Sequence, residues 1–127
     1  MKLLLLTALF LSCSSTTFGQ EAACAQPKTE RDNLMNEAQR NQFTVRRVEF
    51  LGLTHTRDAL VRARMGSLMN EGDLFTRQKL LRSLRRMSML KLIYPVQLKD
   101  VEIRLDGSER QIDMAICFTE RPLPRRQ

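Results

Sequence analysis

The sequence has few of the side chains that usually carry out chemistry. Its 127 residues include one histidine, His55, no tryptophan, and only 6% aromatic residues. It has no G-x-S-x-G motif, no second histidine and no C-x-x-C spacing, which argues against hydrolytic and thiol redox catalysis. It also lacks zinc-ligand spacing and the glycine-aromatic sheet motif of nucleic-acid-binding domains. We therefore expect no enzyme, no metal site, no cofactor and no nucleic-acid partner.

The sequence also lacks an apolar run long enough to cross a bilayer comfortably, which takes about 20 residues. The apolar run at residues 3–11 is shorter, follows Lys2 and precedes small polar residues. This order is typical of a secretory signal peptide, here residues 1–19, with a cut before Gln20. An uncleaved membrane anchor and a lipoprotein cut before Cys13 are the two alternatives.

The charge of the chain is strongly basic. Loss of residues 1–19 would remove Lys2 and no acid, which changes the net charge from +7 to +6. A basic chain favours acidic proteins or lipid headgroups as partners, so contact with an anionic membrane surface stays open. A basic surface that is merely solvated is the simpler interpretation.

Only two cysteines, Cys24 and Cys117, remain after the signal peptide. Two cysteines in an exported chain point to an oxidising compartment and one disulfide. The alternatives are a redox pair and two unrelated buried thiols. Residue 117 falls on the outer face of a predicted strand, and Cys24 has enough chain after it to fold back across that face. We therefore predict that the two are bonded.

The remaining mature chain divides into three parts. Residues 20–42 are polar and have only Leu34 and Met35 as large apolar residues, so we predict a linker with transient helicity. The core is expected at residues 43–122, and residues 123–127 form a polar, proline-broken tail.

The pattern within residues 43–122 predicts two helices between strands. Residues 43–51 alternate as a strand whose phase shifts near Arg46, which indicates a bulge before Gly52 ends the strand. Thr54 or Thr56 is expected to cap a helix that runs to about residue 65. A second helix, capped by Thr76, is expected to run to about residue 89.

The second helix is amphipathic, and two strands follow it. We expect four residues to pack inward (Leu80, Leu81, Leu84 and Met87) and four to form a basic outer side (Lys79, Arg82, Arg85 and Arg86). A strand up to residue 105, a turn at residues 106–109 and an alternating strand at residues 111–119 complete the chain. The predicted fold is α+β, in the order β-α-α-β-β, with a three-stranded sheet and both helices on one face.

Three stretches of the sequence together resemble the POTRA (polypeptide-transport-associated) domain. They are "FTVRRVEFLGLTHTRDAL", "EGDLFTRQKLLRSLRRMSML" and "DVEIRLDGSERQIDMAICFTERP", which span about residues 43–122. The shared marks are Gly52 before a threonine helix start, the Gly72–Asp73 pair, "SLRRM" and the closing Glu120–Arg121 pair. In such a domain His55 lies in a strand-to-helix turn, so we interpret it as a structural residue. The spaced acids Asp100, Glu102 and Asp113 are likewise the solvent-facing half of their strand patterns.

The resemblance implies protein binding by addition of a strand to the edge of the sheet. In the family the third strand is central, which leaves the second strand at an open edge beside the second helix. The partner-binding residues implied here are Val101, Glu102, Ile103, Arg104 and Leu105 on that edge, with Arg82, Arg85 and Arg86 on the helix.

The resemblance also implies a role and a location. We expect a module of the periplasm or the outer-membrane periphery that assists outer-membrane protein assembly or polypeptide transport. Its partner would be a protein or an unfolded outer-membrane client, including a separate protein that carries the barrel. A signal-anchored scaffold of the division type is the alternative function.

Overall fold

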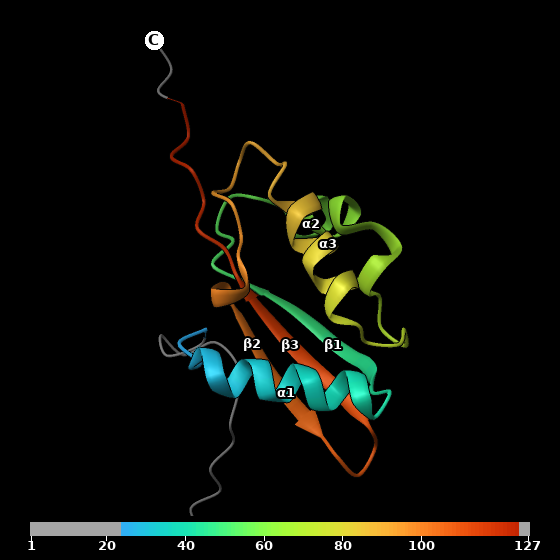
Figure 1. Ribbon diagram of the computed structural model, residues 1–127. Helices are drawn as coiled ribbons and strands as arrows, with labels where there is room; N and C mark the ends of the chain where they lie inside the picture. Colours follow the sequence, from blue (N-terminus) through green and yellow to red (C-terminus); the bar gives the residue numbers. More distant parts are fainter. Residues whose placement is uncertain (1–23, 125–127) are drawn as a thin grey trace, which may run out of the picture.

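The computed structural model describes residues 24–124, so the predictions on signal cleavage, on lipidation and on residues 125–127 lie outside the described residues. The helices are α1 (Lys28–Arg40), α2 (Asp58–Met65) and α3 (Arg77–Met87), and the strands are β1 (Thr44–Leu51), β2 (Val101–Asp106) and β3 (Gln111–Cys117) (Figure 1). A short 3-10 turn, η1 (Gly66–Met69), follows α2, and a second one, η2 (Leu98–Asp100), precedes β2.

The sheet has three strands in the order β1-β3-β2. The central strand β3 pairs parallel to β1 and antiparallel to β2, so β2 is an edge strand, as predicted. The register between β1 and β3 shifts between Val45 and Arg47, which confirms the predicted bulge. The predicted α+β fold with the order β-α-α-β-β is confirmed for the part of the chain that follows α1.

One face of the sheet carries the core. The alternation in β3 buries Ile112, Met114 and Ile116 on that face, and β2 adds Val101 and Ile103. α2 and α3 cover this face with a second set of buried side chains, namely Val61, Met65, Leu80, Leu84 and Met87. The last strand is shorter than predicted, since it ends at Cys117 and not at residue 119.

The prediction of a linker is wrong for residues 28–40, which form the helix α1. Arg31, Met35 and Ala38 are its buried residues, and their spacing of four and three places them on one helix face. Met35 and Ala38 join the same core cluster as the sheet and α3. The hydrophobic pattern missed this helix because its buried face contains an arginine and an alanine. Figure 1 shows α1 crossing the sheet.

Of the two predicted helix N-caps, one is confirmed and the other is wrong. Thr76 caps α3, since its hydroxyl accepts a hydrogen bond from the Lys79 N–H at 3.2 Å, as predicted. The N-cap of α2 is Arg57, without a side-chain hydrogen bond. Thr54 and Thr56 therefore do not cap α2, and their side chains bind elsewhere, as described below.

Within residues 24–124, no helix combines the length and the apolar character that crossing a membrane requires. The same stretch contains no group of three or more histidine, cysteine, aspartate or glutamate side chains placed to hold a metal ion.

Candidate partner-binding site

The edge strand β2 directs the backbone groups of alternate residues away from β3. Because β2 and β3 are antiparallel, the N–H and C=O of one residue both face the partner strand, and those of the next both face away. Val101, Ile103 and Leu105 are the residues that face away, and these groups would pair with an added strand.

The Ile103 backbone is already paired. The side-chain amide of Gln26 donates to the Ile103 carbonyl at 2.9 Å and accepts from the Ile103 N–H at 2.9 Å. A single glutamine side chain therefore makes the two hydrogen bonds that a neighbouring strand would make.

The Val101 backbone is also satisfied. The guanidinium of Arg31 donates to the Val101 carbonyl at 2.8 Å, and the Val101 N–H donates to the carbonyl of Leu98. Arg31 is only 4% exposed and also donates to the carbonyls of Gln26 and Lys99. A buried guanidinium is costly unless its donors are satisfied, so these contacts fix the start of α1 against β2.

A disulfide fastens this segment to the sheet. Cys24 is bonded to Cys117 with a Cα–Cα distance of 6.2 Å, as the sequence predicted. Cys117 lies on the outer face of β3, opposite the core, and the Cys24 N–H lies 3.4 Å from a carboxylate oxygen of Glu102 on the same face. Residues 24–31 thus pass from the outer face, around the β2 edge, to the core face. We call them the N-terminal strap.

The strand β2, to which a partner strand was expected to add, is therefore an edge strand but not an open one. Of the three outward-facing residues of β2, Leu105 is the one whose N–H and C=O groups make no hydrogen bond with the described residues. Glu102 and Arg104 lie on the outer face, where their charged groups are 3.6 Å apart. The expectation of an open edge along residues 101–105 is therefore corrected, because Gln26 and Arg31 occupy part of it. The sequence of the strap gives no signal that it folds over this edge.

Three of the four residues predicted for the basic outer side of α3 are exposed, and the fourth, Lys79, is half-buried. Arg82, Arg85 and Arg86, which we call the arginine face, line a shallow pocket of about 340 Å³ together with Met89. Met89 is 68% exposed. Within the described chain, no carboxylate forms an ion pair with these three arginines. Their charge is therefore available to a partner.

An apolar groove of about 380 Å³ adjoins the arginine face. It lies between α3 and the segment that leads into β2, and Arg85 belongs to both surfaces. The lining residues are Leu81, Leu84, Arg85, Ser88, Val96, Gln97 and Leu98. The sequence pattern placed Leu81 in the core, but this side chain is 37% exposed and lines the groove. The groove depends on how residues 96–98 pack, which periodicity does not reveal.

The turn that contains His55 surrounds a carboxylate. Glu120 accepts hydrogen bonds from the backbone N–H groups of Thr54, His55 and Thr56 and from both threonine hydroxyls, at 2.6 Å and 2.7 Å for the hydroxyls. His55 Nε2 lies 3.2 Å from the same carboxylate. Burial raises the pKa of Glu120, but these hydrogen bonds outweigh it and hold the pKa well below its ordinary range. The arrangement ties the end of the sheet to the start of α2 and supports a structural role for His55.

The other acids named from the sequence also have structural partners. Asp100 accepts from the Gln97 N–H at 2.9 Å in the turn before β2. Asp113 receives two hydrogen bonds from Arg46 across the outer face, at 3.0 Å and 2.6 Å. Glu102 receives the Cys24 N–H, so all three acids stabilise local structure.

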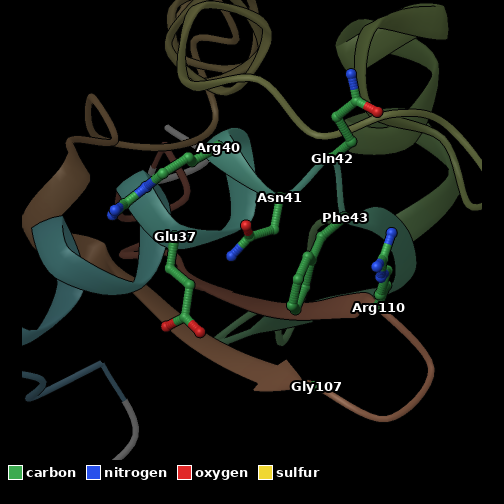
Figure 2. A pocket seen from close by; sticks show the side chains of 7 residues that line it. All are labelled: Glu37, Arg40, Asn41, Gln42, Phe43, Gly107 and Arg110. Carbon is green, nitrogen blue, oxygen red and sulfur yellow. The ribbon is translucent and has the colours of Figure 1, made fainter.

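A polar pocket of about 470 Å³ lies at the hairpin end of the sheet. Figure 2 shows Glu37 and Arg40 towards the end of α1, Phe43 just before β1 and Arg110 in the hairpin turn. The sequence did not predict this pocket, because one of its walls is α1. Its mixed charges do not favour one class of ligand.

Comparison with known proteins gives a family match. The model of the family described as "POTRA: Surface antigen variable number repeat" matches residues 43–121, more than half of the chain. The N-terminal domain of Omp85 from the thermophilic cyanobacterium Thermosynechococcus elongatus is similar in structure, with a TM-score of 0.49 and 20% identity. The match covers 65% of this chain and 35% of that one. None of the curated proteins compared with the chain matches it.

Proposed function

This chain belongs to the POTRA family, and from this premise we propose that it is a protein-binding module of the cell envelope that assists outer-membrane protein assembly or polypeptide transport. A POTRA domain alone is a non-catalytic protein-binding module. The partner in this proposal is another protein or an unfolded outer-membrane client, and the location is the periplasm or the outer-membrane periphery.

The observation that carries the proposal is the arginine face beside the apolar groove. Extended client segments carry alternating side chains, which can place apolar groups in a groove and carboxylates against arginines. The groove leads from α3 to the segment before β2, so a segment seated in it is directed towards the edge strand. Its backbone would then pair with the outward groups of Ile103 and Leu105.

The electrostatic part of this proposal makes binding sensitive to salt. The three arginines are exposed, so their attraction to carboxylates weakens as ionic strength rises. A suitable probe is a short labelled peptide in which valine alternates with glutamate, because it combines an extended backbone with acidic side chains. Fluorescence anisotropy at low and high salt gives its dissociation constant.

The test is charge reversal of the arginine face, with Arg82, Arg85 and Arg86 each replaced by glutamate. The expected result is at least roughly tenfold weaker binding and loss of the salt dependence. Binding that stays unchanged, with an intact circular dichroism spectrum, would show that the arginine face is only a solvated surface.

The matched control reverses three exposed arginines elsewhere, Arg57, Arg64 and Arg110. This control variant has the same net charge as the test variant but an intact arginine face. Binding of the peptide should resemble that of the wild type. An equal loss in both variants would indicate attraction by total charge and would contradict a localised site.

A further inference from the structure

We propose that the N-terminal strap is a built-in competitor for the β2 edge, which a partner strand must displace before it can pair. The inference rests on the proposed function, since it concerns how the same edge is made available. Within the strap, it assigns to Gln26 the role of a displaceable occupant of the binding site, whereas Arg31 stays buried in α1.

The first argument is that the strap occupies the edge with hydrogen bonds of the kind a strand would make. The Gln26 amide satisfies both the N–H and the C=O of Ile103, each at 2.9 Å. An incoming strand needs these same two groups. Gln26 and a partner strand therefore cannot pair with Ile103 at the same time.

The second argument is that the occupant can leave without loss of the core. Residues 25–27 belong to no helix or strand, and Gln26 is held by its side-chain amide and by one bond from Arg31 to its carbonyl. α1 is held separately, by the buried Met35 and Ala38. Release of Gln26 would free Ile103 next to Leu105, whose outward groups are already unpaired, and so create a continuous pairing site.

The third argument concerns the disulfide. It ties Cys24 to the outer face of the central strand β3, beside the β2 edge, and so raises the effective concentration of Gln26 at Ile103. A partner in solution competes against this intramolecular contact. A dithiol reductant converts the disulfide into two protein thiols and is itself oxidised to a disulfide, after which the strap keeps only its hydrogen bonds.

Covering an edge with a loop is one of the ways in which proteins protect it from indiscriminate pairing. Here the cover over Ile103 is one side chain, 77 positions away in the sequence, that makes two hydrogen bonds. A partner strand that pairs with Ile103 therefore has only these two hydrogen bonds to replace at that residue.

Amide hydrogen exchange of the full oxidised chain tests whether the strap covers the edge. In the wild type the Ile103 N–H should exchange slowly and the Leu105 N–H quickly. Gln26→Ala should raise the Ile103 rate by roughly tenfold or more, and the control Gln78→Ala, at an exposed position on α3, should not. An Ile103 rate that is unchanged by Gln26→Ala would overturn the proposal.

Binding of the valine-glutamate peptide tests whether the cover competes with a partner. Gln26→Ala, the double variant Cys24→Ser/Cys117→Ser and the wild type treated with dithiothreitol should each bind roughly tenfold tighter than the oxidised wild type. Gln78→Ala should bind as the wild type does. Circular dichroism checks that each variant is folded, and Gln26→Ala keeps the disulfide, so the two ways of loosening the strap are independent.

The outcomes separate this inference from the function on which it rests. Equal binding by the oxidised wild type and all loosened forms would overturn the competitor role and leave the proposed function standing. Absence of binding by every form, while exchange shows that Ile103 is exposed in Gln26→Ala, would refute strand capture itself and the competitor role with it.

Discussion

Removal of the disulfide should cost the protein a large part of its stability, because the bond closes nearly the whole described chain into a loop. Cys24 and Cys117 are 93 positions apart. The chain-entropy estimate for a loop of this length is about 4 to 5 kcal/mol, and measured values for native disulfides are about 2 to 5 kcal/mol. A domain of this size is stable by about 5 to 15 kcal/mol in total, so the loss is a substantial fraction.

The magnitude depends on whether the segment that carries Cys24 unfolds together with the sheet. Met35 and Ala38 bury α1 in the same core as β2 and α3, so we expect α1 to unfold together with the sheet in one cooperative transition. If the strap and α1 instead detached first, the bond would constrain only a local opening and would contribute little to global stability.

Urea unfolding followed by circular dichroism measures this difference. The double variant Cys24→Ser/Cys117→Ser should unfold in one transition, with a free energy of unfolding about 3 to 5 kcal/mol lower than that of the oxidised wild type. A loss below about 1 kcal/mol, or a separate early transition in the wild type, would refute the reasoning that α1 is part of the cooperative fold.

Three further predictions concern single positions. Glu120→Gln should lower the stability of the protein at neutral pH and weaken the dependence of that stability on acid. Because the folded pKa of Glu120 is depressed, its carboxylate contributes stability above the unfolded pKa, and this contribution is lost as the pH falls towards the folded pKa. Unfolding measured from about pH 7 to about pH 3 checks this, and an unchanged acid dependence would contradict it. Met35→Ala should cost about 2 to 4 kcal/mol, whereas the exposed control Met89→Ala should cost less than about 0.5 kcal/mol; equal losses in urea unfolding would argue against docking of α1. Gly52→Ala should cost more than about 2 kcal/mol, since residue 52 has a φ of 85° and the added Cβ would collide with the Phe118 carbonyl, and wild-type stability of this variant would disprove that account.

The part of the fold that repeats a simple period could be predicted from the sequence. Alternation in β3 and the phase shift near Arg46 gave the sheet faces and the bulge, because strand side chains alternate with a period of two. The disulfide followed from the outward position of Cys117 in that alternation. These features depend on neighbours that are close in the sequence or on one face of a strand.

The features that escaped prediction depend on contacts between distant residues. α1 was missed because Arg31 and Ala38 are not recognised as a buried face until Arg31 is seen to donate to carbonyls of the β2 region. The threonines near His55 were expected to cap a helix, and the carboxylate that they bind, Glu120, lies more than 60 positions later.

The candidate site was predicted in part for the same reason. The exposed arginines of α3 follow from helix periodicity, whereas the covering of Ile103 depends on where the side chain of Gln26 comes to rest. A glutamine in a polar segment carries no signal of such a role. The resemblance to the POTRA domain therefore implied the edge strand, but nothing in the sequence indicated the segment that occupies it.

The central claim is that extended acidic segments bind along the β2 edge and the arginine face. The most direct measurement is a nuclear magnetic resonance titration of the isotope-labelled, reduced chain with the valine-glutamate peptide, which follows every backbone amide. The account predicts saturable shifts at Ile103 and Leu105, together with shifts along α3 near Arg85. Shifts confined to β1, or to the pocket beside Arg110, would place the peptide elsewhere and contradict the claim.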